Sequence, residues 1–471
     1  MDGMKRWYPL VLLFLASCAT GPGPQNVPQN VPHPTAPPTA PASTKSVLGN
    51  SMSTYKGPQD APRVLAEVEK RMAAENRPLD TLSRGDLIQY GGLQLADRRF
   101  KPAETTFTAL LTRDPKDREA LYSLALIALA QGQNAQSQTY LDRLLTDYPK
   151  DWQALSLKGQ MALAEGKKPQ ARRAFEASLK VHGNSDALLG MAQLAEGAKK
   201  WKDAENYLDQ AIKLNPSNDE AFSSLSRVDQ AQEKWYSAEK DISQAITLSP
   251  TDPWHYLDRA RLCWVHLYKP DQALADANKV LQLDPQNFFG HLYRAQILDS
   301  QNHTAEAWSE YQWVIKSKPQ DRAAYPPAAM LAFQYKDWTQ AAAFAHEAAQ
   351  DYPGEYAFPL IEALSAQFQH EPALARQILQ AASLRYAPET VENEIFRFVM
   401  SPIDAFTLND LLSKEKDKNV RVRLRFYEGC EYVAAGDPRS AKAAFQSIVN
   451  EQMIGIPEIR MAQSWLKDLG S

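Results

Sequence analysis

Residues 189–216 have the sequence LGMAQLAEGAKKWKDAENYLDQAIKLNP, and residues 258–285 have the sequence DRARLCWVHLYKPDQALADANKVLQLDP. Both stretches place apolar residues at spacings of three and four, which is the pattern of successive amphipathic helices. Both end in a proline, which cannot continue a helix. We therefore expect each stretch to form a helical hairpin whose second helix stops at Pro216 or Pro285.

The same terminal proline recurs along the chain at a nearly fixed distance. It is found at Pro115, Pro149, Pro216, Pro250, Pro285, Pro319 and Pro353. The gaps are 34, 67, 34, 35, 34 and 34 residues, and the gap of 67 is a double step with Gly183 near its middle. A period of 34 is the signature of a helix-turn-helix solenoid. The longer interval of 35 predicts one extra residue in the turn around Tyr268.

Small residues occupy equivalent places in every unit, where closely packed helices need small side chains to cross. In the first helices these are Gly91, Ala125, Gly159, Ala192, Ser226, Ala260, Ala295, Ala329 and Ala363. In the second helices they are Ala103, Ser137, Ala171, Ala204, Ala238, Ala273, Ala307, Ala341 and Ala375. Larger apolar residues follow four positions later in most units, at Phe107, Leu141, Phe175, Leu208, Ile242 and Tyr311.

This layout resembles the tetratricopeptide repeat family over nearly all of residues 84–388. The resemblance implies an all-α fold, a superhelical solenoid of about ten helical hairpins plus end caps. Residues 389–420 keep the length of a unit but lack its small residues, so we expect an irregular helical pair there. The pattern returns in the last repeat, residues 421–453. Residues 63–83 and 454–471 are predicted to cap the two ends, because an uncapped unit exposes an apolar face.

The N-terminus has the organisation of a targeting segment. Residues 1–17 hold a short basic region and a short apolar run, and Leu15-Ala16-Ser17-Cys18 resembles the lipobox of bacterial lipoproteins. That resemblance implies cleavage before Cys18, diacylation of its thiol and, since Ala19 is not Asp, outer-membrane sorting. A plain secretory signal is the alternative. Residues 18–62 are rich in proline and low in complexity, so we expect an extended tether that reaches on the order of 100 Å.

The sequence lacks the common motifs of catalysis and cofactor binding. It contains no HExxH, GxSxG, P-loop, CxxC or glycine-rich dinucleotide-binding motif, so we predict no enzyme, cofactor or metal. His255, Asp258 and His266 are near one another in sequence but are read as structural residues. Cys263 and Cys430 are expected to be buried free thiols. A net charge of −4 gives no support to nucleic acid or an anionic membrane surface as a partner.

The family resemblance places a binding groove on the first helices. Its groove positions in the fifth to seventh units correspond to Arg227, Trp254, Arg261, Trp264, Phe289, Gln296 and Asp299. Arg and Trp commonly anchor interfaces, and such a groove suits a peptide with acidic and apolar groups. The alternative is that the tryptophans pack between repeats and the arginines are solvated.

The order of elements over roughly residues 340–470 resembles enterobacterial outer-membrane lipoproteins that act as adaptors for cell-wall hydrolases. The resemblance implies a lipid-anchored envelope scaffold that faces the periplasm and binds periplasmic proteins or peptides, including hydrolases or envelope-assembly factors. A pilotin or secretion-system assembly subunit is the alternative. An enzyme with a site in the groove at His255 and Asp258 is a third hypothesis, and self-association into a homo-oligomer stays open.

Overall fold

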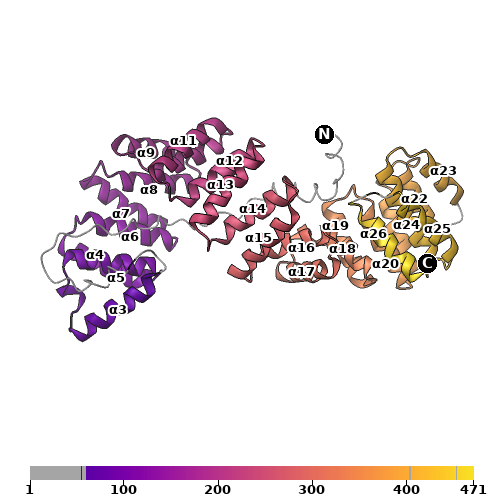
Figure 1. Cartoon of the computed structure of the whole chain (residues 1–471), viewed down its shortest axis with the longest axis horizontal. Helices are drawn as coiled ribbons and strands as arrows, with labels where there is room; N and C mark the ends of the chain where they lie inside the picture. Colours follow the sequence, from indigo (N-terminus) through magenta and orange to yellow (C-terminus); the bar gives the residue numbers. More distant parts are fainter. Residues whose placement is uncertain (1–54, 56–59, 402–404, 452, 454, 471) are drawn as a thin grey trace. The chain divides into compact units, whose positions relative to one another are not determined.

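The structure is a computed structural model that describes residue 55 and residues 60–401, 405–451, 453 and 455–470. These residues form 24 α-helices and two short 3-10 helices, which confirms the predicted all-α fold (Figure 1). The predicted signal segment, Cys18 and almost all of the predicted tether lie outside the described residues. Among the helices that are described, none combines the length and the apolar character needed to cross a bilayer.

The helices are short and follow one another closely in sequence. Their bounds are α3 Ala61–Ala74, η2 Leu79–Thr81, α4 Arg84–Ala96, α5 Phe100–Arg113, α6 Arg118–Ala130, α7 Asn134–Asp147, α8 Trp152–Ala164, α9 Lys168–Val181, α10 Ser185–Glu196, α11 Trp201–Leu214, α12 Asp219–Ala231, α13 Trp235–Leu248, α14 Pro253–Val265, α15 Pro270–Leu283, α16 Phe288–Ser300, α17 Thr304–Ser317, η3 Arg322–Ala324, α18 Tyr325–Gln334, α19 Trp338–Asp351, α20 Ala357–Phe368, α21 Pro372–Ser383, α22 Val391–Met400, α23 Ala405–Lys414, α24 Lys418–Ala434, α25 Pro438–Val449 and α26 Pro457–Asp468.

The described residues form two compact units that join in sequence between Ser249 and Pro250. The first unit holds α3 and the five hairpins from α4–α5 to α12–α13. The second unit begins with the four hairpins from α14–α15 to α20–α21. It continues with the pair α22–α23, the hairpin α24–α25 and the closing helix α26.

The small residues predicted at the helix crossings are all buried. The ring of Phe175 on α9 shows why. An added Cβ would lie 2.5 Å from this ring at Gly159 on α8 and 2.1 Å from it at Gly190 on α10. Where serine replaces alanine at a crossing, its hydroxyl donates to a facing carbonyl oxygen, as Ser137 does to Ala125 at 2.8 Å. The buried hydroxyl group is thereby satisfied.

A polar cap starts most of the first helices. The side chain of an Asp or Asn accepts a hydrogen bond from a backbone N–H two or three residues later, at Asp117, Asp151, Asn184, Asn218, Asp252 and Asn287. Such a cap satisfies a donor that the helix leaves unpaired. Some caps also join neighbouring hairpins: Arg84 donates to Asp117 and Arg118 donates to Asp151, both at 2.6 Å.

The turn inside each hairpin contains one residue in the left-handed region. In the first hairpins these residues are Arg98, Gly132, Gly166, Lys199 and Glu233, and in the sixth hairpin it is Tyr268, with a φ of 54°. The step from Glu233 to Tyr268 is 35 residues, so the extra residue predicted in this turn is present.

The end of the second unit departs from a simple stack. The guanidinium of Arg423 on α24 lies 2.7 Å from Glu355, ahead of α20, and 2.8 Å from Glu458 on α26. Helix α26 therefore closes the array and also contacts helices from earlier hairpins (Figure 1). Cys263 and Cys430 are both buried and form no disulfide with each other, as predicted.

Candidate functional site

Two half-buried aromatic residues that the sequence assigns to the groove lie together in the second unit. The rings of Trp254 on α14 and Phe289 on α16 are 6.3 Å apart between centroids. The adjacent ring of Phe288 stands edge-on to Phe289 at 5.5 Å. The Nζ of Lys318 lies 4.4 Å from the centre of the Phe288 ring and 5.9 Å from that of Phe289. These contacts are cation–π interactions, in which an ammonium group is attracted to the ring face.

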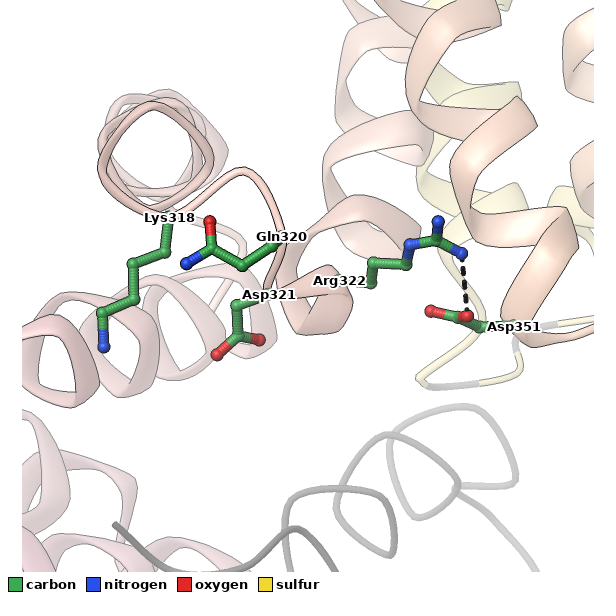
Figure 2. A pocket seen from close by; sticks show the side chains of 5 residues that line it. All are labelled: Lys318, Gln320, Asp321, Arg322 and Asp351. Carbon is green, nitrogen blue, oxygen red and sulfur yellow. Dashed lines mark hydrogen bonds and ion pairs between the residues drawn. The ribbon is translucent and has the colours of Figure 1, made fainter. Parts of the chain in front are cut away.

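A surface hollow of about 660 Å³ lies beside this cluster. Figure 2 shows the side chains that line it, which are those of Lys318, Gln320, Asp321, Arg322 and Asp351. Lys318 and Asp321 project into the hollow in the same direction, while Arg322 turns towards Asp351 (Figure 2). The lining comes from the turn between α17 and η3, from the first residue of η3 and from the last residue of α19.

The charged side chains around the hollow differ in whether they form ion pairs. Arg322 pairs with Asp351 at 3.0 Å and with Glu347 at 3.2 Å. Asp321 caps η3 by accepting from the backbone N–H of Ala323 at 3.3 Å. Lys318 has its two aromatic contacts and makes no ion pair within the described residues. Its exposed ammonium group can therefore donate to a carboxylate or carbonyl oxygen of a bound partner, beside rings that can support an apolar side chain.

Asp299, another predicted groove residue, has a structural partner inside the second unit, whereas Gln296 is buried beside it in the fold of α16. The carboxylate of Asp299 lies 2.8 Å from Arg460 on α26, and the same guanidinium donates to Gln334 at 3.0 Å. Burial raises the pKa of Asp299, and the charge of Arg460 opposes that rise. Gln296 is buried, and its Oε1 has no hydrogen-bond partner among the described atoms.

The remaining predicted residues are distributed along their helices. Arg227 is exposed on α12 in the first unit and donates to Ser224 at 2.9 Å. Arg261 and Trp264 are half-buried on α14. His255 on the same helix is buried, with its Nε2 3.8 Å from the Asp252 carboxylate, and Asp258 is half-buried. Of the predicted groove residues, Trp254 and Phe289 thus lie side by side, whereas Asp299 forms an ion pair with Arg460 on α26.

Sequence reasoning missed the residues of the hollow. Lys318, Gln320 and Asp321 belong to the turn around Pro319, which was read only as a terminator of the preceding helix. The available signal was the polar residue two positions after the recurring proline, which caps the next helix in the other units as well. The contact of Lys318 with Phe288, thirty residues earlier, gave no sequence signal.

The hairpins repeat about every 34 residues, and their small residues are buried at each crossing. A family model described as the tetratricopeptide repeat protein 21 N-terminal ARM repeat matches residues 103–239. The chain has a tetratricopeptide repeat-like fold. A search of curated proteins found no match to this chain.

Several solved structures are similar to parts of this tetratricopeptide repeat array. PilF of Pseudomonas aeruginosa is 20% identical, covers 47% of this chain and 97% of its own, and has a TM-score of 0.41. PilW, a type IV pilus biogenesis factor, is 15% identical, with coverages of 45% and 96% and a TM-score of 0.36. A tetratricopeptide repeat protein from Parabacteroides merdae is 14% identical, with coverages of 59% and 98% and a TM-score of 0.36.

Proposed function

We propose that this protein is a lipid-anchored scaffold of the bacterial envelope, facing the periplasm, that binds other proteins through the side chains of its tetratricopeptide repeats. The observation that carries the proposal is the cluster of Trp254, Phe289 and Lys318 beside the polar hollow. Aromatic rings supply large contact areas with few rotatable bonds, and a neighbouring cation adds direction. An extended or helical segment with acidic and apolar side chains fits this combination.

The anchor in this proposal is a diacylated Cys18, joined to the repeats by residues 18–62. The lipobox resemblance and the basic and apolar run before it support the anchor. A single scaffold held at a membrane raises the local concentration of whatever it binds, which is how a protein without its own chemistry directs enzymes to a surface. Cell-wall hydrolases and envelope-assembly factors are the partners we propose.

The test is affinity capture of the full lipidated chain from detergent-solubilised membranes, with crosslinking and mass spectrometry. We expect a reproducible set of periplasmic proteins, depleted by Phe289→Ala and by Lys318→Ala. Lys316→Ala is the matched control, because Lys316 is an exposed lysine at the end of α17, two residues before Lys318, and makes no aromatic contact within the described residues. Arg261→Ala combined with Trp264→Ala tests the rest of the predicted groove.

The outcomes separate the hypotheses. Equal capture by wild type, Phe289→Ala and Lys318→Ala would remove the site assignment, and the absence of any reproducible partner would remove the scaffold proposal. One partner recovered at fixed stoichiometry would favour the assembly-subunit alternative over an adaptor with exchangeable partners. Circular dichroism should show unchanged helix content in Phe289→Ala and Lys318→Ala, because the Phe289 side chain is half-buried and the Lys318 side chain is exposed.

A further inference from the structure

The surface of α9 in the first unit carries a concentration of positive charge. Residues 167–173 hold four cationic side chains and no carboxylate, and three lysines follow in residues 199–202, in the α10–α11 turn and the start of α11. A Cβ added to Gly197 would lie 3.6 Å from the Nζ of Lys168, so this turn lies beside the start of α9. The two basic segments therefore form one patch, although the whole chain has a net charge of −4.

A hollow of about 450 Å³ lies within this patch. Its cationic lining is Lys168, Arg172 and Arg173, and its apolar lining is Pro169, Leu194 and Ala198. The hollow thus combines three positive groups with an apolar floor. That combination suits a ligand with an anionic group attached to an apolar body.

Most of these cations are not neutralised by the protein. Lys167 pairs with Glu165 at 2.7 Å, and Arg172 is 4.0 Å from Glu176, at the limit of an ion pair. Within the described residues, the side chains of Lys168, Arg173, Lys199 and Lys200 make no ion pair. Lys168 and Arg172 also lie four residues apart on one helical face, where like charges destabilise a helix. An external anion would remove this repulsion.

We propose that this patch, defined as Lys168, Arg172, Arg173, Lys199 and Lys200 with the enclosed hollow, binds the phosphate groups of anionic phospholipid headgroups. The proposal rests on the lipid anchor proposed above, since a tether from Cys18 holds the repeats within on the order of 100 Å of a bilayer. Each cation near an anionic surface adds about 1 kcal/mol, too little for stable attachment alone. Tethering makes such weak contacts effective because binding becomes intramolecular.

Docking of the patch would orient the first unit on the membrane. The cations lie on α9 and on the turn that precedes α11, whereas the candidate protein-binding cluster lies in the second unit. The first unit would thus act as a membrane-facing base, and partners would be held by a different set of hairpins. Raised ionic strength would weaken this attachment because salt screens exposed charges.

The test uses the full mature chain with Cys18→Ser, which removes acylation. The vesicles contain phosphatidylcholine alone or phosphatidylcholine with about one third phosphatidylglycerol. In low-salt co-sedimentation we expect binding only to the anionic vesicles. The triple variant Lys168→Gln, Arg172→Gln, Arg173→Gln should bind about a hundredfold more weakly, from roughly fivefold per cation removed. The matched control is Lys101→Gln, Lys213→Gln, Lys240→Gln, which removes three exposed lysines from other helices of the first unit; it should bind like the unmodified chain.

Three results would overturn the proposal. These are failure to bind anionic vesicles at low salt, equal loss of binding in the control triple variant, and release by inorganic phosphate well beyond that by chloride at equal ionic strength. The last result would identify a site for free phosphate instead of a lipid surface. All three are measured without any protein partner, so they are independent of the capture experiment that tests the scaffold function.

Discussion

Replacing Gly190 with alanine should destabilise the first unit, although alanine favours helices more than glycine does. The new Cβ would lie 2.1, 2.4 and 2.5 Å from three carbons of the Phe175 ring. The ring cannot retreat freely, because it is fully buried and Gly159 lies against it, 2.5 Å away by the same measure. Overpacking of this kind costs about 1–3 kcal/mol or more, against about 1 kcal/mol gained from helix propensity.

The matched control is Gly92→Ala on α4. A Cβ at Gly92 would meet nothing within 4 Å, so this variant gains helix propensity without a clash. We expect Gly92→Ala to be more stable than wild type by about 1 kcal/mol. We expect Gly190→Ala to be less stable by about 2 kcal/mol, from the upper part of the overpacking range less the propensity gain.

The assay is urea denaturation of the full chain, followed by far-ultraviolet circular dichroism. A third variant, Phe175→Leu, relieves the clash, so its combination with Gly190→Ala should be less destabilised than the sum of the two single changes. The reasoning is refuted if Gly190→Ala matches Gly92→Ala, or if the two changes at the ring are strictly additive.

Three further perturbations test other parts of the array. Burial raises the pKa of Glu431 from 4.5 to about 8, so the folded state holds an extra proton between these two pH values. The free energy of unfolding should therefore fall by up to about 5 kcal/mol as the pH rises from 4.5 to about 8. Glu431→Gln should flatten this dependence in denaturation measured from about pH 4 to 9. Tyr268→Gly should stabilise the folded protein by up to about 1 kcal/mol, because Tyr268 is 66% exposed and has a left-handed φ of 54°, which strains a residue with a side chain. An unchanged melting temperature would contradict this strain. Arg460→Met should cost about 1–3 kcal/mol by leaving the half-buried Asp299 without its cation. Adding Asp299→Asn should restore part of that loss in the same denaturation assay.

The architecture was predictable because each unit repeats the same short-range rules. The recurring prolines gave the period, and the paired small residues gave the crossings at which the side chains are buried. The extra residue before Tyr268 followed from a single interval of 35. Gly190 was missed because it lies two positions before Ala192, which marks the crossing within its own hairpin, and packs against Phe175 of the preceding hairpin.

The candidate site was less accessible to sequence reasoning because it depends on contacts between units. Groove positions taken from the family resemblance included Trp254 and Phe289, whose rings are in contact. The same positions included Asp299, whose carboxylate pairs with a helix that begins more than 150 residues later. No local pattern distinguishes a side chain that faces a partner from one that faces the chain's own closing helix, and Lys318 was omitted because turns were read only as helix breaks.

The ion pair between Arg460 and Asp299, together with Arg423 between Glu355 and Glu458, has a consequence for how the second unit unfolds. A linear stack loses order progressively from its free ends, because each module is supported only by its immediate neighbours. Here the final helix forms ion pairs with hairpins well inside the stack, so its detachment separates half-buried charged groups and exposes the buried carboxylate of Glu458. Unravelling from the C-terminus is therefore blocked at its first step, and α14–α26 should melt in one cooperative transition.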